Sequence, residues 1–424
     1  HILFYSFAKR SIKMSARLIH YVYEIRAISV ESLNPDAFGG GDRVFVELFK
    51  RWQKSGVKGR IITSSEGFRL FTSCKLYSNY DVLSRSIVEN SHSLIMIPII
   101  WFVRAFKVFK RWNGTIKKPT VIYTPGDFIC DVIPACLLRI THRNVIWATH
   151  IHYIIPPPWK RKLSFITDLF SFLLQRISFL IIGTFADIVI VVNSYVKSNL
   201  TKMGIPRGKI YKSSCGIDFK IIQSISPNNN YQYEGCFVGR LHPGKGTYDL
   251  IEIWSKVVKE ISDAKLAVVG GGDPFYVNRL IEEIKEKHLE KNVHLLGFLP
   301  FPFSVIKSSK LLLYPDHEAG YGWGIAIAEA LACGVPAVAY DLPVYREVYE
   351  NKIRLIKPWN TNEFAREVII LLKDDKKRHE LGEIGRKYVK KYDWDLVAGD
   401  LLRLFNLKVK EKMAQMLSKD SSHK

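Results

Sequence analysis

The stretch KLLLYPDHEAGYGWGIAIAEALACGVPAVAY, residues 310–340, contains the pattern that decides the fold. It begins with an apolar run at Lys310–Tyr314, passes through a glycine-rich loop into a helical pattern at Ile325–Ala332, and ends in a second apolar run at Ala337–Ala339. Two buried strands joined by a helix form a parallel βαβ unit, because parallel strands need such a crossover. The stretch therefore predicts an α/β protein built on parallel sheets.

The same alternation of apolar runs and helical patterns continues through all 424 residues and predicts two sets of strands. The first set is expected at Arg26–Glu31, Gly59–Ser64, Thr120–Tyr123, Asn144–Thr149 and Ile188–Val192, and the second at Tyr233–Val238, Lys265–Val269, Val293–Leu296, Lys310–Tyr314 and Ala337–Ala339. Between the sets, SPNNNYQYEG from Ser226 onward has the composition of a linker. We expect two doubly wound domains, 1–226 and 231–391, with a C-terminal helix at 392–424 that packs back on the first domain.

The composition excludes some classes of protein and points to an anionic partner. Hydrophobic residues make up 47% of the chain and charged residues 24%, which are ordinary globular values and exclude wholesale disorder. The formal net charge is +22, and residues 1–200 hold 27 basic against 12 acidic side chains. A surface this basic suits an anionic membrane, a phosphorylated substrate or nucleic acid.

The cysteines and the apolar stretches predict the cellular setting. The six cysteines form no C-x-x-C pair and no Cys/His cluster, so we expect a reduced, cytoplasmic protein without a metal site. The first residues are basic and mildly apolar, but they are too short for a membrane span and carry no cleavage site. Polar residues interrupt Leu163–Val192, and we expect none of its pieces to supply the roughly 20 apolar residues that crossing a bilayer needs.

Glycine-rich turns follow three of the predicted strands, where they can bind anions. Gly39–Gly41 stands ahead of a helix expected from Asp42, and backbone amides at a helix N-terminus favour a phosphate. The turn GRLHPGKG at 239–246 adds Arg240 and Lys245, which suit a diphosphate. The third turn, at 270–272, does not complete G-x-G-x-x-G and is only supporting evidence. A plain tight turn and a solvated surface loop are the alternatives for the first two.

Glu329 is the carboxylate that the sequence singles out. It lies near the start of the helical pattern at Ile325–Ala332, where an acidic side chain is favoured and can accept hydrogen bonds from sugar hydroxyls. Its neighbours are Ile, Ala and Leu, so we do not expect it on a solvated helix face.

Five motifs in one order resemble those of a retaining glycosyltransferase of family 4. They are Gly39–Gly41 with Arg43, the block NSYVKSNLTKMGIPRGKI followed by Cys215–Asp218, Gly239–Gly246, Gly322–Glu329 and Gly334–Pro336, and they span nearly the whole chain. The resemblance implies the GT-B fold, in which two Rossmann-like domains face each other across a cleft. It also implies metal-independent transfer of a sugar from a UDP- or GDP-sugar, with no cofactor and with retention of the anomeric configuration.

The resemblance also implies roles for individual residues. Arg240 and Lys245 are expected to hold the donor diphosphate, Glu329 the ribose hydroxyls, and His152 the transferred sugar, with His150 as the competing histidine. Further donor-binding residues are expected at Gly40, Gly41, Arg43, Gly239, Gly271, Glu318, Tyr321, Gly322, Trp323, Gly324 and Ile325. One position departs from the family: Tyr321 stands eight residues before Glu329, where the family has its first Glu, and Glu318 is the nearest carboxylate.

The basic first half contains two candidate membrane-binding segments. WFVRAFKVFKRW, residues 101–112, predicts a helix with cations along one side, a composition typical of interfacial helices on anionic lipid. The second candidate starts at Trp159 and runs into 163–174. We expect contacts with the membrane or the acceptor from Trp101, Arg104, Lys107, Lys110, Arg111, Lys160 and Arg161. The acceptor is then a lipid-linked saccharide or a polyprenyl phosphate at the cytoplasmic membrane face; the alternative is that both apolar faces pack on the domain.

Other protein classes stay open at this point. An oxidoreductase needs a full G-x-G-x-x-G with an acidic residue about 20 positions later, and no turn here provides both. A nucleic-acid-binding protein has only the net charge in its favour, because no reader motif is present, so we expect no nucleic-acid partner. The departure at Tyr321 leaves room for a non-catalytic relative that acts in assembly, and epimerases and phosphorylases share the fold.

Overall fold

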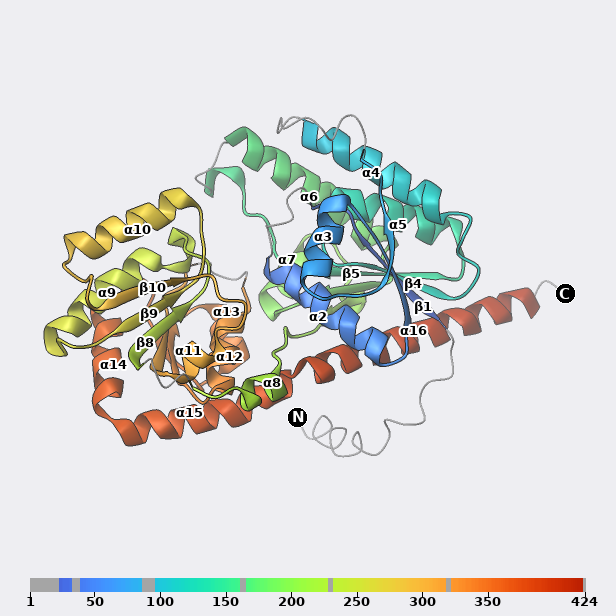
Figure 1. The fold of residues 1–424 in the computed structure, drawn as a ribbon. Helices are drawn as coiled ribbons and strands as arrows, with labels where there is room; N and C mark the ends of the chain where they lie inside the picture. The colour runs from blue at the N-terminus through green and yellow to red at the C-terminus, as the bar shows by residue number, and fades with distance from the viewer. Residues whose placement is uncertain are drawn as a thin grey trace.

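The chain folds into two parallel sheets, each covered by helices (Figure 1). The structure, a computed structural model, describes residues 23–32, 39–85, 96–160, 165–227, 232–317 and 322–421. The first sheet has seven strands in the order β3-β2-β1-β4-β5-β6-β7. Their bounds are β1 (Glu24–Ser29), β2 (Lys58–Thr63), β3 (Asn79–Val82), β4 (Thr120–Thr124), β5 (Val145–Ile151), β6 (Ile188–Val191) and β7 (Ile210–Lys212). All neighbouring strands pair in parallel.

The second sheet has six strands in the order β10-β9-β8-β11-β12-β13, again all parallel. Their bounds are β8 (Tyr233–Val238), β9 (Leu266–Val269), β10 (Val293–Gly297), β11 (Ser309–Tyr314), β12 (Ala337–Tyr340) and β13 (Arg354–Ile356). The prediction of two Rossmann-like, doubly wound domains is confirmed.

Helices connect the strands of both sheets. In the first domain they are α2 (Gly40–Lys54), α3 (Ser65–Ser73), α4 (Ile97–Trp112), α5 (Ile129–Thr141), α6 (Phe165–Phe185) and α7 (Ser194–Lys202). The second domain has α9 (Thr247–Glu260), α10 (Pro274–Glu286), α11 (Phe303–Lys307), α12 (Ile325–Ala332), α13 (Pro343–Tyr349), α14 (Thr361–Lys373) and α15 (Asp375–Val389). The short α8 (Phe219–Ser224) precedes the second sheet, and α16 (Trp394–Ser421) ends the described chain.

Strand β4 shows why both faces of the first sheet are covered. All of its side chains are buried, and successive side chains point to opposite faces. Val121 and Tyr123 join the apolar cluster that α2 covers, whereas Ile122 joins the cluster on the other face with Val108 of α4. Such continuous apolar runs are typical of parallel strands buried on both sides, and they explain why the sequence revealed the central strands.

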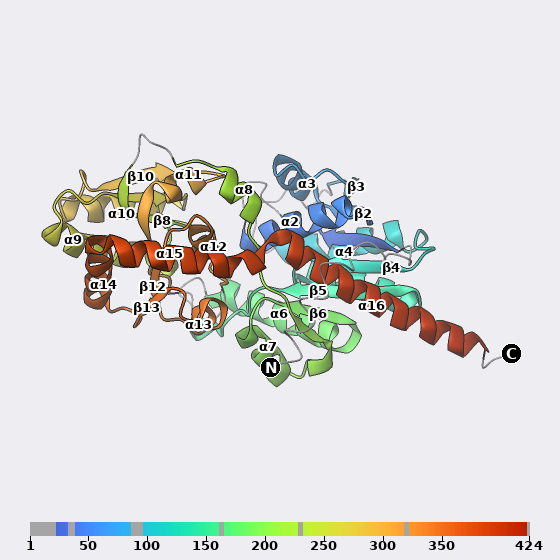
Figure 2. The same cartoon turned by 90° about the horizontal axis from the view of Figure 1, so that it is seen from below.

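Helix α16 carries the chain from the second domain back across the first, as expected (Figure 2). Trp52 of α2 donates a hydrogen bond from Nε1 to the carbonyl oxygen of Ala398 at 3.2 Å. The ring of Trp52 also lies 5.4 Å from that of Phe405. These contacts extend the apolar core of the first domain onto α16.

Three strands were absent from the sequence prediction, namely β3, β7 and β13. All three are edge strands of three or four residues, too short to form a recognisable apolar run. The first strand also begins two residues earlier than expected, at Glu24, and α2 begins at Gly40.

Candidate active site

Each sheet has one place where the order of its strands reverses, and the site residues gather there. In the first sheet this switch point lies between β1 and β4, and in the second between β8 and β11. Ligands of open α/β sheets bind outside the carboxyl ends of the strands at such points. The glycine turn at 239–246 follows β8, and the loop that leads to Glu329 follows β11.

The N-terminus of α2 and His152 form the wall of the first domain at this point. Gly39 donates its backbone N–H to Oδ2 of Asp42 at 2.8 Å, which fixes the first turn of the helix. A Cβ atom on Gly41 would lie 3.3 Å from the ring of His152, so glycine lets the ring approach the helix closely. His152 also hydrogen-bonds through Nε2 to the carbonyl oxygen of Pro125 at 3.0 Å. Burial lowers the pKa of His152 to about 4, so its ring is neutral at neutral pH.

His150 occupies a different environment from His152, although the two rings stack with centroids 4.1 Å apart. His150 is buried in the sheet, and its Nδ1 lies 3.1 Å from the hydroxyl of Tyr123. His152, in contrast, lines a cavity. The geometry therefore favours His152 over its competitor as the histidine that meets a ligand.

The cavity has a volume of about 670 Å³ and lies between the carboxyl ends of β1 and β4 and helices α4 and α6. Its polar lining includes Glu31, Asp42 and Asp127. Gln175 of α6 donates from Nε2 to Oδ2 of Asp127 at 2.8 Å. Burial raises the pKa of Asp42 and of Asp127 to about 6.

The sequence prediction did not include Asp42 and Asp127 as site residues. A signal was available for Asp127, which follows a buried strand and a Pro-Gly turn in the stretch TPGD at residues 124–127. Carboxylates placed just after parallel strands lie where ligands bind.

In the second domain, two loops are locked together at the switch point. Gly246 has φ of +68°, and a Cβ there would lie 1.7 Å from the carbonyl oxygen of Pro315, so only glycine fits. His317 donates its backbone N–H to the carbonyl oxygen of Gly244 at 2.9 Å. The loops after β8 and β11 therefore keep a fixed distance from each other.

Lys245 is held in place by this pair of loops. Its Nζ lies 3.2 Å from Oδ2 of Asp316, a carboxylate that is only 1% exposed. The hydroxyl of Tyr345 donates to the same oxygen at 2.6 Å. Arg240 is exposed on the same loop. The structure thus brings both predicted cations to the carboxyl end of β8.

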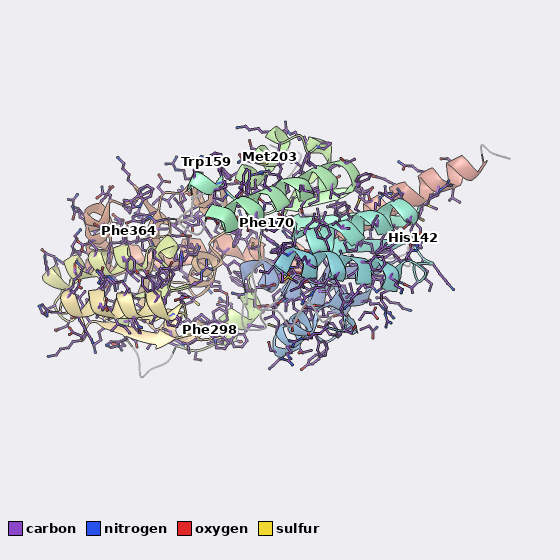
Figure 3. The ribbon with its side chains drawn as sticks, turned by 90° about the horizontal axis from the view of Figure 1, so that it is seen from above. His142, Trp159, Phe170, Met203, Phe298 and Phe364 are labelled. Carbon is purple, nitrogen blue, oxygen red and sulfur yellow. The ribbon has the colours of Figure 1, made fainter. Side chains whose placement is uncertain are left out.

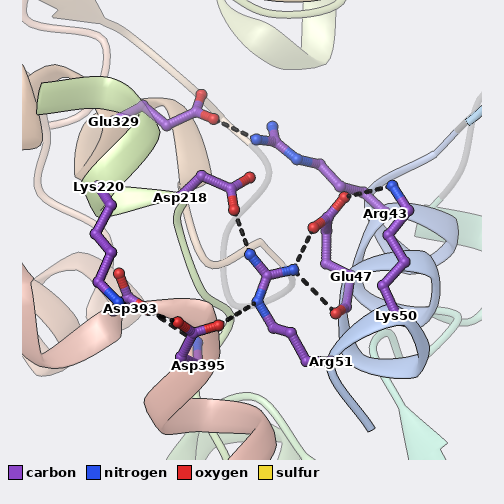
Figure 4. A network of polar contacts seen from close by, with 9 residues as sticks. All are labelled: Arg43, Glu47, Lys50, Arg51, Asp218, Lys220, Glu329, Asp393 and Asp395. Atoms are coloured by element: carbon purple, nitrogen blue, oxygen red, sulfur yellow. Dashed lines mark hydrogen bonds and ion pairs between the residues drawn. The ribbon is translucent and has the colours of Figure 1, made fainter. Parts of the chain in front are cut away.

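Glu329 lies in α12 and is buried, as its apolar neighbours indicated, with 3% of its side chain exposed. Arg43 of α2 donates from Nη2 to its Oε1, so this ion pair joins the two domains (Figure 4). Gly324 caps α12 with φ of +72°, and Tyr349 donates its hydroxyl to the Gly324 carbonyl oxygen at 2.7 Å. Trp323 is buried beside them. Glu318 and Tyr321 lie outside the described residues.

A second polar cluster centres on Arg51 of α2, where the chain passes between the two domains (Figure 4). Its guanidinium binds Glu47 of the same helix, Asp218 ahead of α8, and Asp395 at the start of α16, the last at 3.2 Å. A further contact joins the two domains: Glu347 of α13 accepts hydrogen bonds from the backbone and side chain of Ser194 and lies 2.7 Å from Nζ of Lys212.

The structure corrects the prediction of a basic lipid-facing stripe on α4. Arg104 is only 2% exposed and donates to the carbonyl oxygens of Val30 and Ser32 at 2.6 and 2.8 Å. Lys107 is half-buried and donates to the carbonyl oxygen of Ser84 at 2.6 Å. Lys110 and Arg111 are exposed, although Arg111 pairs with Asp81 at 3.2 Å. The spacing of the cations along α4 does not show that its inner face lies against backbone carbonyl oxygens, which accept hydrogen bonds from the buried Arg104.

The other predicted acceptor-side residues are placed differently. Trp101 lines the cavity, with its ring 5.8 Å from that of Phe128. The side chain of Lys160 and the whole of Arg161 lie outside the described residues.

Helix α6 also corrects an expectation. We expected polar residues to interrupt the apolar stretch at 163–192 and to leave no piece that could cross a membrane, but α6 runs for 21 residues, and Asp168–Phe185 is long and apolar enough by length and composition to do so. Gln175 does not break the helix because it turns inward and accepts the backbone N–H of Ile155 at 2.7 Å. Only 28% of Asp168–Phe185 is buried within the protein.

Comparisons with known proteins match the chain to two glycosyltransferase family models. The family described as Glycosyltransferase Family 4 matches residues 38–220, and the family described as Glycosyl transferases group 1 matches residues 218–388. The chain belongs to glycosyltransferase family 4. The predicted family is confirmed, and its glycosyltransferase homologues support the predicted enzyme class.

Individual relatives are distant. The chain is 29% identical over 164 residues to a poly(glycerol-phosphate) alpha-glucosyltransferase of Bacillus subtilis, which is 38% of this chain and 24% of that protein. It is 27% identical over 176 residues to a phosphatidyl-myo-inositol mannosyltransferase of Mycobacterium leprae, which is 40% of this chain and 45% of that protein. The chain thus spans between a quarter and a half of the length of these two relatives.

Solved structures share the fold at low identity. HepE of Anabaena in complex with UDP-glucose is 16% identical with a TM-score of 0.70, covering 92% of this chain and 99% of that one. Sucrose-phosphate synthase of Thermosynechococcus elongatus is 18% identical with a TM-score of 0.73, and the match covers 92% of this chain and 100% of that one. The predicted GT-B fold is therefore confirmed.

Proposed function

We propose that this chain transfers a sugar from a UDP- or GDP-sugar to an acceptor hydroxyl, without a metal or other cofactor. The observation that carries the proposal is the pairing of two switch points, with Lys245 and Glu329 in one domain and His152 with its cavity in the other. Lys245 and Arg240 provide the positive charge that a donor diphosphate needs. Glu329 accepts hydrogen bonds from the ribose hydroxyls, either beside its hydrogen bond from Arg43 or in place of it.

In the proposed reaction, the acceptor oxygen forms a bond to the anomeric carbon while the bond from that carbon to the phosphate oxygen breaks. The departing nucleoside diphosphate takes the acceptor proton on the same face of the sugar, so the anomeric configuration is retained. Arg240 and Lys245 stabilise the charge that develops on the diphosphate. Removal of one such positioned donor typically slows an enzyme by about 10²–10³-fold. His152 contacts the sugar as a neutral ring.

We further propose a lipid-linked acceptor and a peripheral position on the cytoplasmic membrane face. Helices α4 and α6 lie with α5 on one face of the first domain, and Figure 3 looks down on this face. Their outer sides expose large apolar side chains, namely Ile99, Phe102 and Phe106 of α4 and Leu169, Leu173, Ile177 and Leu180 of α6. An exposed apolar face of this kind marks an interaction site, and Lys110 and Arg111 at the end of α4 add positive charge.

A liposome experiment tests the membrane proposal. The protein is expected to sediment with anionic liposomes at low salt, and Phe106→Asp should weaken this binding by about tenfold, because burying one Phe side chain contributes about 1.5–3 kcal/mol. Phe298→Asp is the matched control, since Phe298 is 70% exposed, like Phe106 at 68%, but lies in the second domain (Figure 3). Equal losses in the two variants, or no sedimentation of the wild type, would refute the membrane proposal.

A panel of UDP-, GDP- and ADP-sugars, scored by the rise in melting temperature, tests the donor. A ligand at 100 times its dissociation constant stabilises the folded state by about 2.7 kcal/mol. That corresponds to a rise of about 5–10 °C for a domain of roughly 150–250 residues. A selective rise with UDP- or GDP-sugars is expected, and a selective rise with ADP-sugars would contradict the proposed donor.

A further inference from the structure

The cavity beside His152 has apolar walls and an acidic end. Its walls come from α4, the start of α5 and α6, with Trp101, Phe128, Phe170 and Leu174 among the lining side chains. Two of these helices, α4 and α6, expose further apolar side chains on their outer sides. The cavity therefore opens beside a surface that suits hydrocarbon, and it suits the apolar body of an acceptor.

The polar end of the cavity carries negative charge. Glu31 follows β1, Asp42 lies in the first turn of α2, and Asp127 follows β4. Among the described residues that line the cavity, none is a lysine or an arginine. Two cations of the adjacent helices do not line the cavity: Arg104 donates to backbone carbonyl oxygens, and Arg176 donates from Nη2 to the carbonyl oxygen of Ile155 at 3.1 Å, although the charge of Arg176 still acts on Asp127.

Ser178 adds an independent observation about what the cavity accepts. This α6 residue is completely buried and lines the cavity, and its hydroxyl has no hydrogen-bond partner in the part of the chain that the structure describes. A buried hydroxyl without a partner is costly, and a neutral polar group of a ligand can satisfy it.

Charge decides between the two acceptor classes that the proposed function leaves open. A phosphate monoester at the acidic end would face three carboxylates, with no lysine or arginine among the described residues that line the cavity, and like charges repel there. Carboxylates are instead good acceptors for the hydroxyl groups of a sugar. On the basis of the proposed glycosyl transfer, we propose that this cavity takes an uncharged, hydroxyl-bearing head group joined to an apolar body, a glycolipid-like acceptor, and disfavours a bare lipid phosphate.

Short-chain acceptors that share one hydrocarbon test this inference. Geranyl glycosides of several sugars and geranyl phosphate are titrated into the full chain, and dissociation constants are measured by calorimetry at pH 7.5. At least one glycoside should bind tenfold or more tightly than geranyl phosphate. If geranyl phosphate binds as tightly as every glycoside, or more tightly, the inference is wrong.

Two leucines provide a matched pair of variants that locates the binding. Leu174 of α6 lines the cavity, whereas Leu407 of α16 is exposed and does not line it. Leu174→Trp should fill the cavity and weaken glycoside binding at least tenfold, and Leu407→Trp should leave it within twofold. Glycoside binding that survives Leu174→Trp would place the acceptor elsewhere and overturn the inference.

A second variant keeps the test decisive if Leu174→Trp does not fold. Asp127→Asn removes one of the three carboxylates and keeps an oxygen that can accept from Gln175. It should narrow the preference for glycoside over phosphate by threefold or more at pH 7.5; an unchanged preference would contradict the role of charge. A failure of the proposed function is recognised by a different measurement. If no nucleotide sugar binds, the proposed glycosyl transfer fails, whereas the preference for glycoside over phosphate is measured without any nucleotide sugar.

Discussion

The contact of Arg51 with three carboxylates makes a quantitative prediction about the junction of the two domains. Arg51→Met keeps most of the side-chain volume and removes the guanidinium, which is 16% exposed. A hydrogen bond between charged groups contributes about 1.5–3 kcal/mol, the expected loss for Asp218, which is equally buried. The helical pair with Glu47 adds about 0.3–0.5 kcal/mol. The pair with Asp395, whose side chain is 48% exposed, adds about 0.2–1 kcal/mol.

The expected total loss is therefore about 2–4.5 kcal/mol, which at about 2–4 °C per kcal/mol lowers the melting temperature by about 4–18 °C. Thermal scans and urea titrations followed by circular dichroism measure it. The control is Arg403→Met in α16. Arg403 pairs with Asp400 of the same helix, and its exposure of 62% predicts a loss below about 0.5 kcal/mol. The reasoning is refuted if Arg51→Met melts within about 1 °C of the wild type, or no lower than the control.

Three further predictions concern the site itself. Alanine at both Arg240 and Lys245 should weaken nucleotide binding by about 10²-fold or more, since each charge-assisted bond contributes about 1.5–3 kcal/mol; unchanged affinity in a calorimetric titration would remove the diphosphate role. Glu329→Ala should weaken nucleoside diphosphate binding about tenfold or more while leaving inorganic diphosphate binding unchanged, and equal losses for both ligands would contradict a ribose contact. Burial raises the pKa of Asp127 to about 6, so its contribution favours the folded state below about pH 4 and is lost as the pH rises through about 6. The melting temperature of Asp127→Asn relative to the wild type should therefore increase from pH 4 to pH 7, and a constant difference would refute this.

Features that depend on residues close together in the sequence, such as buried strands, could be predicted. Contacts between segments far apart in the sequence could not. The central strands appeared as apolar runs because parallel strands are buried on both faces, and the apolar neighbours of Glu329 predicted its burial. The edge strand β3 was not predicted because its sequence, NYDV, contains no apolar run. Composition showed the basic character of α4 but not its orientation, so the buried Arg104 was assigned to the wrong side.

The parts of the site that the sequence concealed are those that join segments far apart in the chain. Arg43 was expected near the donor, but its partner lies 286 residues away in the other domain. No spacing rule connects α2 to α12, because their contact depends on how the two domains meet. The place of Asp127 in the site likewise depends on distant segments, because β4 lies beside β1 in the sheet and Gln175 of α6 donates a hydrogen bond to Asp127.

The most direct test of the central claim is sugar transfer itself. The full chain is incubated with the nucleotide sugar that raises its melting temperature, with a geranyl glycoside as acceptor, and both products are followed by NMR. The account predicts release of the nucleoside diphosphate that requires the acceptor, together with a new glycosidic bond of the same anomeric configuration as the donor. Donor binding without any transfer, or a product with inverted configuration, would contradict it.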